Sequence, residues 1–273
     1  MTSVPATAGV SVYIIAFNEI DKIEAAITSV QWADEILVID SHSTDGTTEL
    51  AQKLGARVEH VEFEGYGRLR NAAIKHCSRE WIFSLDADER CTSEVANEIM
   101  ELVASGSPAH DYYSVPRRNF FLGRWIRHSG WYPNFRQPQL FKQGAMVYDE
   151  LPVHEGFVPI SKKPPGVLRN AIWQVPFKDV GELLRKADKY STLGAQKLAG
   201  RNITVWTAFA HGLWAFFKHY IFKRGFLDGG PGLVIAVANF EGTFYRYLKA
   251  VPISHSSSKP TPSRDRAPPE ELQ

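Results

Sequence analysis

The sequence is short of cysteine and of several common targeting and binding motifs. Its 273 residues include only two cysteines, Cys77 and Cys91, which excludes a disulfide framework and a four-cysteine zinc site. We expect both to be thiols of a reducing compartment. The first residues lack the charged and then apolar pattern of a signal peptide, so export is not expected. No internal repeat is present.

Two common nucleotide-binding motifs are also missing. The turn after the first predicted strand has no GxGxxG pattern, and no GxxxxGK[ST] loop occurs in the chain. A nicotinamide-dependent dehydrogenase and a P-loop enzyme are therefore excluded.

Charge is divided unevenly along the chain, although the formal net charge is only +1. Residues 1–111 hold 8 Lys and Arg against 19 Asp and Glu, whereas residues 112–273 hold 23 against 11. No acidic residue occurs in 112–148 or in 189–227. A basic half suggests an anionic partner, which at this point is nucleic acid, phospholipid or a phosphorylated substrate.

Strand and helix patterns alternate over the first 110 residues or so. Short apolar runs rich in β-branched residues predict strands, and apolar residues at helical spacing lie between them. The predicted strands cover 10–16, 35–40, 57–61 and 81–85, and the predicted helices cover 20–30, 45–54 and 69–77. Because the strands are apolar throughout, we expect a mostly parallel sheet buried between two helical layers. The predicted fold class is therefore α/β.

The second half of the chain is organised differently. A loop-rich, aromatic and basic segment starts near residue 112, and helical spacing resumes at 179–200. The pattern predicts helices at 203–222 and 233–248, with a glycine-rich turn at 227–232 between them. We divide the chain into a flexible N-terminus (1–9), a first α/β half (10–111), a second half (112–178), a helical amphipathic C-terminal extension (179–250) and a disordered tail (251–273).

The sharpest local feature is Asp86-Ala87-Asp88, directly after the fourth predicted strand. Ligands of open α/β sheets bind beyond the carboxyl ends of the strands. There the first strand also runs into Phe17–Glu19 and the second into Asp40–Gly46. Two carboxylates at such an edge suit Mg²⁺ or Mn²⁺, which bind partly through substrate phosphates. The alternative is a turn whose acids cap the next helix, but three polar turns on one edge favour the metal.

Several stretches of the sequence match a known family. In the first half they are Val10–Glu19 (VSVYIIAFNE), Glu35–Gly46 (EILVIDSHSTDG) and Trp81–Glu89 (WIFSLDADE); in the second half they are Pro116–Arg127 (PRRNFFLGRWIR), Gly130–Pro133 (GWYP), Pro152–Glu155 (PVHE) and Arg224–Gly229 (RGFLDG). The chain resembles glycosyltransferase family 2, whose GT-A-fold enzymes use nucleotide-sugar donors. Within it the chain is most similar to the bacterial lipopolysaccharide core β-glucosyltransferase branch. The resemblance implies a GT-A (Rossmann-like) fold, with nucleotide-sugar binding in 10–111 and acceptor binding and the catalytic base in 112–178.

The resemblance also assigns roles at the donor site. It implies that Asp40 contacts the uridine of a UDP-sugar and that Asp86 reaches the donor ribose or the metal. Asp88 would bind the Mg²⁺ or Mn²⁺ that bridges the diphosphate, where a cation neutralises charge that grows as the glycosidic bond breaks. The other residues that it assigns to the donor pocket are Phe17, Glu19, Arg70 and Asn71.

An inverting transfer needs a base that takes a proton from the acceptor hydroxyl. The resemblance implies a carboxylate of the acceptor half. We choose Glu155, with Asp149 and Glu150 as runners-up, because these three acids end a long acid-free stretch. The alternative for Glu155 is a surface carboxylate paired with an arginine of that stretch.

Residues 112–148 carry six Lys and Arg and ten aromatic residues. Such a composition fits single-stranded nucleic acid or sugars and phosphates. No known nucleic-acid module accompanies it, so we expect a glycolipid acceptor and no nucleic-acid partner. Trp131 and Tyr132 are the candidate sugar contacts, and Arg117 and Arg118 are the candidate phosphate contacts. A buried aromatic plug and a solvated basic face are the respective alternatives.

Residues 202–217 form a run of sixteen uncharged residues that is rich in aromatics. Spanning a bilayer takes roughly 20 apolar residues, and His211 interrupts the run. With Lys223 and Arg224 shortly behind it, the run is typical of a helix lying in the membrane interface. The alternative is a helix packed on the catalytic domain. We expect a cytoplasmic protein, peripherally associated with the inner face of the cytoplasmic membrane.

One departure from the family lies at Ile172–Val175, where relatives tend to carry a histidine. Gln174 in that position would change a polar contact of the donor or metal site. The predicted reaction is inverting transfer of a hexose, with glucose expected, from a UDP-sugar to a membrane glycolipid, with lipopolysaccharide core as the expected acceptor. The rival hypotheses are a capsule or exopolysaccharide transferase that uses a polyprenyl-linked acceptor, and a non-catalytic, membrane-docked nucleotide-binding protein.

Overall fold

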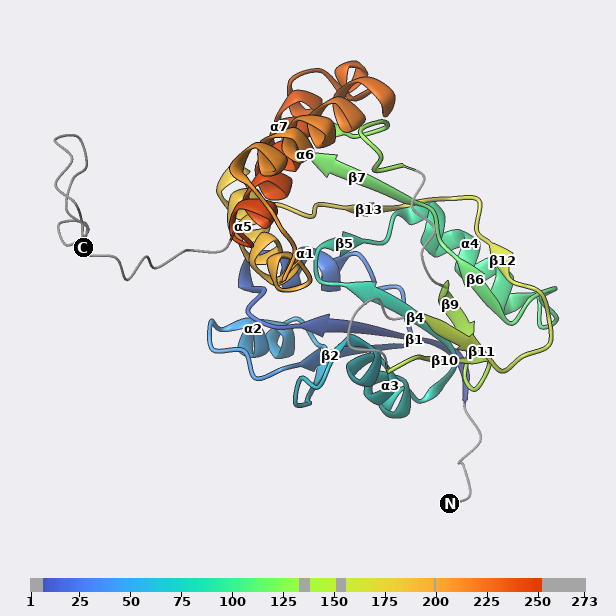
Figure 1. The fold of residues 1–273 in the computed structure, drawn as a ribbon. Helices are drawn as coiled ribbons and strands as arrows, with labels where there is room; N and C mark the ends of the chain where they lie inside the picture. The colour runs from blue at the N-terminus through green and yellow to red at the C-terminus, as the bar shows by residue number, and fades with distance from the viewer. Residues whose placement is uncertain (1–6, 133–137, 151–155, 199, 252–273) are drawn as a thin grey trace, which may run out of the picture.

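The computed structural model describes residues 7–132, 138–150, 156–198 and 200–251 (Figure 1). Within these residues a seven-stranded sheet forms the centre, in the order β12-β6-β9-β4-β1-β2-β3. Its strands are β1 (Thr7–Ala16), β2 (Glu35–Asp40), β3 (Arg57–His60), β4 (Arg79–Asp86), β6 (Tyr112–Ser114), β9 (Pro138–Lys142) and β12 (Gly166–Val167). The strands β1 to β4 run parallel, and β9 runs antiparallel to both β4 and β6. The predicted α/β class with a mostly parallel sheet is confirmed.

Helices cover both faces of this sheet. Along β1, Val12 and Ile14 face one apolar cluster, which helices α1 (Ile20–Thr28), α2 (Thr47–Lys53) and α4 (Ser93–Ala104) complete. Tyr13 and Ile15 face a second cluster, which α3 (Tyr66–His76) completes. Neighbouring side chains of a strand point to opposite faces, so a strand buried on both sides is apolar throughout. This explains why β1, β2 and β4 could be recognised from the sequence, whereas β3, at the edge of the sheet, is neither apolar throughout nor buried.

A smaller sheet stands beside the carboxyl end of the central one. It has the order β5-β13-β7-β8, and its strands are β5 (Glu89–Arg90), β7 (Arg117–Phe121), β8 (Arg124–Trp125) and β13 (Ile172–Gln174). A separate antiparallel pair consists of β10 (Met146–Tyr148) and β11 (Phe157–Pro159). Because β5 follows β4 almost directly, the small sheet begins at the Asp86-Ala87-Asp88 turn.

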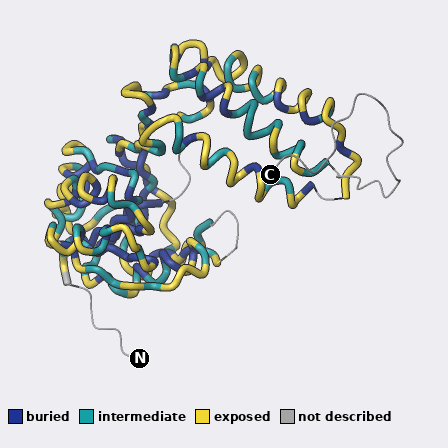
Figure 2. Tube along the Cα trace, turned by 90° about the vertical axis from the view of Figure 1, so that its left-hand side faces the viewer, coloured by how far each residue is buried: buried dark blue, intermediate teal, exposed yellow. Residues whose placement is uncertain are grey.

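The C-terminal helices project from the α/β part (Figure 2). They are α5 (Val180–Gln196), α6 (Val205–Phe217) and α7 (Gly229–Leu248), with a π-helical turn η1 (Lys218–Phe222) and a 3-10 turn η2 (Gly225–Asp228) between the last two. The side chains of Asp179 and Thr204 accept hydrogen bonds from the first turns of α5 and α6, which fixes where these helices begin. Among the described residues, we find no helix with the length and apolar character needed to cross a membrane.

The predicted turn at 227–232 is wrong in its second part, because α7 already begins at Gly229. Pro231 is tolerated there since the first turn of a helix needs no backbone N–H. A Cβ on Gly232 would lie 2.0 Å from the carbonyl oxygen of Gly225. Glycine therefore lets the start of α7 pass directly against η2.

Buried Asp228 ties this turn to the loop that follows β8. Its carboxylate accepts hydrogen bonds from the backbone N–H groups of Arg127 (3.1 Å) and His128 and from the Ser129 hydroxyl (2.9 Å). Arg124 donates to the carbonyl oxygen of Leu227 at 3.1 Å. These contacts fix the 127–129 turn, which leads to Trp131 and Tyr132.

Both cysteines are free and buried. Burial raises the pKa of the Cys77 thiol and of the Cys91 thiol to about 12. Neither thiol is therefore ionised near neutral pH, and both behave as apolar core groups.

Candidate functional site

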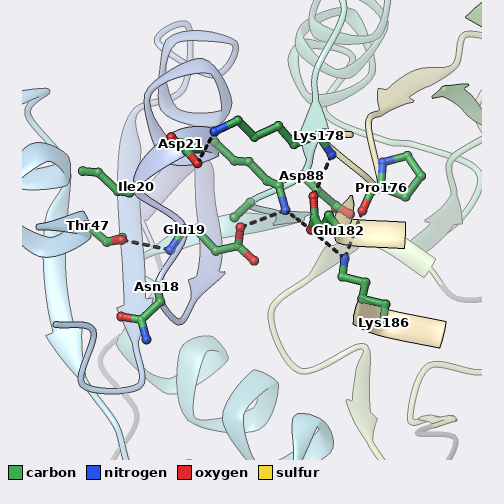
Figure 3. Close-up of polar contacts among 12 residues, drawn as sticks. Asn18, Glu19, Ile20, Asp21, Thr47, Asp88, Pro176, Lys178, Glu182 and Lys186 are labelled. Carbon is green, nitrogen blue, oxygen red and sulfur yellow. Dashed lines mark hydrogen bonds and ion pairs between the residues drawn. The ribbon is translucent and has the colours of Figure 1, made fainter. Parts of the chain in front are cut away.

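The site lies where β1, β2 and β4 end. Because these strands are parallel, the turns that follow them meet at one edge of the sheet. The turns after β1 and β2 are joined by hydrogen bonds: Asn18 N–H donates to Ser43 Oγ at 2.8 Å, and Thr44 N–H donates to Asn18 Oδ1 at 2.9 Å. Glu19 N–H donates to Thr47 Oγ1 at 3.0 Å (Figure 3). The edge is therefore a connected backbone surface.

The predicted donor residues of these two turns differ in exposure. Phe17 is 59% exposed at the end of β1, available to stack on a flat ring. Glu19 is half-buried and lies 3.2 Å from Lys22 Nζ. Asp40 is fully buried, and its carboxylate accepts hydrogen bonds from Ser43 and contacts His60 Nδ1 at 3.2 Å. Asp40 thus holds the shape of its own turn.

The predicted polar pair on α3 binds protein groups. Buried Arg70 donates to Asp86 Oδ1 at 2.8 Å and to Ser84 Oγ at 3.0 Å. The amide of Asn71 bonds both backbone groups of Tyr148, donating to its carbonyl at 2.8 Å and accepting from its N–H at 2.9 Å. Arg70 therefore orients Asp86, and Asn71 anchors the strand that precedes Asp149.

The acidic turn after β4 concentrates three carboxyl groups. Burial alone would raise the pKa of Asp86, but attraction to Arg70 and Arg117 holds it below the usual value. Burial, and then repulsion from Asp86, raises the pKa of Asp88 to about 6. Burial also raises the pKa of Glu89 to about 7, although Arg117 Nη2 lies 2.6 Å from its Oε1. Negative charge on Asp88 is therefore costly without a nearby cation.

The small sheet supplies the partners of these carboxyl groups. Gln174 Nε2 of β13 lies 3.1 Å from each carboxylate oxygen of Asp88. Arg117 of the neighbouring β7 approaches Gln174 Oε1 at 3.5 Å and pairs with Glu89. Gln174, at the position where relatives tend to carry a histidine, therefore lies beside the acidic pair Asp86 and Asp88. The Glu89–Arg117 pair could not be predicted from the sequence, because only the folded small sheet places β5 and β7 on either side of β13.

The donor set here fits Mg²⁺ or Mn²⁺ in a site completed by a ligand. Asp88 offers hard oxygen atoms in a half-buried position where Asp86 repels its charge, and a divalent cation would relieve this repulsion. Among the residues that the structure describes, no group of three or more His, Cys, Asp or Glu could hold a metal alone. Any metal here would need further oxygen atoms from water or substrate phosphates.

The three base candidates could be placed only in part. Glu155 lies outside the described residues. Asp149 is half-buried, and its Oδ1 is buried without a hydrogen-bond partner in the described part of the chain. Glu150 is exposed and accepts a hydrogen bond from Arg68 Nε at 3.0 Å.

The four acceptor candidates point in different directions. Arg117 and Arg118 are consecutive in β7, so their side chains leave opposite faces of the small sheet. Arg117 turns to Glu89, whereas Arg118 is exposed with its guanidinium 4.8 Å from the Trp125 ring. Trp131 packs with Phe121 and Phe177, and Tyr132 meets Trp125 edge to face. The structure therefore does not bring these four residues to one ligand.

A network of ion pairs connects the donor edge to the helical extension (Figure 3). Lys22 Nζ of α1 lies 2.9 Å from Glu182 of α5 as well as close to Glu19. Lys178 Nζ pairs with Asp21 at 2.7 Å, and Lys186 Nζ lies 3.2 Å from Glu182. The Lys22–Glu182 and Lys178–Asp21 pairs join residues that are 160 and 157 positions apart, so no local pattern in the sequence indicates them.

Fold and site together define an α/β protein with an acidic pair beyond the carboxyl end of a central parallel strand. The family model described as "Glycosyl transferase family 2" matches residues 11–157, and the chain belongs to that family. The predicted membership of glycosyltransferase family 2 is confirmed, and the chain is a glycosyltransferase by family.

Relatives with similar sequences cover nearly the whole chain. An uncharacterized glycosyltransferase of Rickettsia conorii is 26% identical over 93% of this chain and 92% of its own length. The lipopolysaccharide core biosynthesis glycosyltransferase LpsC of Rhizobium meliloti is 29% identical over 89% of this chain and 94% of its own length. Among solved structures, residues 1–349 of TarS from S. aureus are 17% identical, with a TM-score of 0.47 over 89% of this chain and 83% of that one.

Proposed function

We propose that the chain is an inverting glycosyltransferase that moves a hexose from a UDP-sugar to a membrane glycolipid, and we expect the hexose to be glucose. Lipopolysaccharide core is the proposed acceptor, since LpsC, a relative over most of both chains, carries that function in its name. The observation that supports the chemistry best is the Asp86-Ala87-Asp88 turn at the edge where three parallel strands end. Asp86 is already balanced by Arg70 and Arg117, whereas the Asp88 side chain has only the neutral amide of Gln174 as its hydrogen-bond partner in the described residues, so a divalent cation bound to a diphosphate would compensate its charge.

In this proposal the donor lies across the ends of β1, β2 and β4. Phe17 stacks on the uracil, while Glu19 and the backbone of the Asp40 turn line the nucleotide pocket. Asp88, with Asp86 beside it, holds Mg²⁺ or Mn²⁺, which supplies charge neutralisation of the leaving diphosphate. Gln174 orients the Asp88 carboxylate, and Arg70 orients that of Asp86.

The base that takes the proton of the acceptor hydroxyl remains Glu155 in our proposal, with Asp149 as the next candidate. Asp149 has a buried oxygen without a protein partner in the described residues. Glu150 is weaker, because its carboxylate is exposed and already paired with Arg68.

We further propose that the enzyme works at the inner face of the cytoplasmic membrane, with α6 and η1 on the lipid. Gly212 faces Phe240 and Phe244 of α7, whereas Trp206 and Trp214 of α6 are exposed. Trp206 is 80% exposed and Phe222 is 66% exposed. Exposed basic residues follow on the same segment: Lys218, Lys223 and Arg224. Apolar rings beside cations are what an anionic bilayer surface binds.

The first test is thermal unfolding of the purified protein with UDP, with and without Mn²⁺. A ligand that binds only the native state raises its stability by about 2.7 kcal/mol at a hundredfold excess over Kd. We expect a stabilisation by UDP that needs Mn²⁺ and that Asp88→Ala abolishes. Asp188→Ala, which removes an exposed carboxylate of α5, serves as the matched control and should retain the full effect.

Transfer assays then separate the rival functions. Loss of glucose transfer in folded Asp88→Ala and Glu155→Gln variants supports the proposal, and full activity in both refutes it. Transfer to a polyprenyl-linked acceptor but not to lipopolysaccharide core would favour the capsule or exopolysaccharide enzyme. No stabilisation by UDP or any other nucleotide would favour the non-catalytic binding protein.

A further inference from the structure

A cleft between α5 and α7 belongs to none of the sites described above. Its volume is about 320 Å³, within the range of small-ligand pockets. Small residues of the two helices open it, since Ala187 and Gly242 stand opposite each other where larger side chains would meet.

The described residues that line the cleft combine aromatic rings with cations and include no acid. Trp131, Phe177 and Tyr190 supply the rings, and Lys186 and Arg246 supply the positive charge. Lys186 is paired with Glu182, whereas Arg246 has no carboxylate within 4.0 Å among the described residues. The Arg246 Nε is buried and has no hydrogen-bond partner in the same part of the chain. A guanidinium that has neither a carboxylate partner nor a hydrogen bond at its Nε favours an anionic ligand with acceptor oxygens.

The cleft is connected to the donor edge through Lys186. Its Nζ donates to the carbonyl oxygen of Pro176 at 2.9 Å, and the neighbouring Val175 N–H donates to the carbonyl oxygen of Asp88 at 2.9 Å. Figure 3 shows Lys186, Pro176, Glu182 and Asp88 in one close-up. A ligand in the cleft is therefore next to the segment that holds the acidic pair.

We propose that this cleft binds a phosphorylated sugar of the acceptor glycan, an inference that rests on the proposed function. Aromatic side chains cover the apolar faces of sugar rings, and Arg246 binds the phosphate, for which a guanidinium is the better matched cation. Trp131 is the one predicted acceptor residue that lines the cleft. Arg118 and Tyr132, in contrast, lie at Trp125 and do not contribute to it.

The chain offers a substitution that fills the cleft without removing any contact. A Cβ on Gly242 would lie 3.9 Å from the Cβ of Ala187, an ordinary van der Waals distance, so position 242 accepts a Cβ without a clash. Gly242→Phe places a ring in the cleft and replaces a helix-weakening glycine, so the fold should be kept. Val237→Phe, at an exposed position of the same helix outside the cleft, is the matched control. Arg246→Gln removes the charge alone.

The probe is a lipid-free lipopolysaccharide core oligosaccharide, used as isolated and after phosphatase treatment, titrated by calorimetry into protein saturated with UDP and Mn²⁺. We expect Gly242→Phe to weaken binding of the phosphorylated form at least tenfold and Val237→Phe to change it less than twofold. Arg246→Gln should weaken the phosphorylated form about tenfold and the dephosphorylated form much less.

Unchanged oligosaccharide affinity in folded Gly242→Phe would overturn the assignment of the cleft. An equal loss for both forms in Arg246→Gln would overturn the phosphate contact. A wild-type protein that binds UDP but neither form of the oligosaccharide also refutes the inference, while leaving the donor site in place. Failure to bind UDP in the same titrations refutes the proposed function instead.

Discussion

Replacing Asp228 by alanine tests how the acceptor-side loop is held. The residue is 1% exposed, and its carboxylate accepts hydrogen bonds from the backbone of Arg127 and His128 and from the hydroxyl of fully buried Ser129. His128 Nδ1 also lies 3.1 Å from it. Alanine leaves these donors without an acceptor in a place where water has little access.

The loss in the free energy of unfolding depends on how many hydrogen-bond donors lose the Asp228 carboxylate. Each buried donor left unpaired costs about 1–3 kcal/mol, and breaking a buried charged network costs about 3–5 kcal/mol in all. We therefore expect Asp228→Ala to lower the free energy of unfolding by about 4 kcal/mol, out of a total of about 5–15 kcal/mol. Ser129→Ala removes one of the bonds and should cost about 1 kcal/mol. Asp228→Asn should fall between them, because its amide keeps one acceptor but turns a donor toward donors.

Urea unfolding of the three variants measures these differences, and thermal unfolding with UDP and Mn²⁺ measures the donor site separately. The stabilisation by UDP should survive in Asp228→Ala, because the hydrogen bonds of the Asp228 side chain in the described residues go to the acceptor-side loop at 127–129. An Asp228→Ala protein that loses no more stability than Ser129→Ala would show that the carboxylate does not hold the loop. Loss of the UDP effect in a folded variant would show that this loop supports the donor edge as well.

Two further predictions concern the helical extension. Burial opposes ionisation of Glu182, but hydrogen bonds from Lys178 and from the ammonium groups of Lys22 and Lys186 lower its pKa to about 2. The ionised carboxylate therefore stabilises the fold above the unfolded pKa near 4.5, and this stabilisation is lost as the pH falls toward 2. Glu182→Gln should lower the free energy of unfolding, measured with urea, by about 2 kcal/mol at pH 7 and by less than half of that at pH 3. The same loss at both pH values would contradict the ionic role of Glu182. For α6, Trp206→Glu combined with Trp214→Glu should weaken co-sedimentation with phosphatidylglycerol vesicles at least tenfold without changing stabilisation by UDP. Equal binding of this variant and the wild type would refute the lipid contact.

The central sheet and the donor edge were predictable because both depend on local signals. A parallel strand buried on two faces is apolar throughout, as Ile36–Ile39 is, and its polar continuation marks the ligand edge. Side-chain direction in the short strands was not predictable in the same way. Arg117 and Arg118 appear equivalent in a basic segment, but a one-residue shift in a strand moves a side chain to the other face. Only the pairing of β7 with β13 decides which of them reaches Glu89.

The opposite charges of the two halves are partly explained by ion pairs that join one half to the other in the fold. The acid-rich first half carries the acidic turn at 86–89 and the start of α1, and the basic second half supplies their partners. Arg117 pairs with Glu89 and Lys178 pairs with Asp21. Lys22 of the first half reverses the pattern by pairing with Glu182. Part of the charge difference is thus neutralised between the halves. The cations with no carboxylate within 4.0 Å in the described residues include Arg118, Arg127 and Arg246, and Arg246 lines the cleft between α5 and α7. Charge composition alone therefore indicates an anionic partner, and only the pairing in the fold indicates where on the surface it binds.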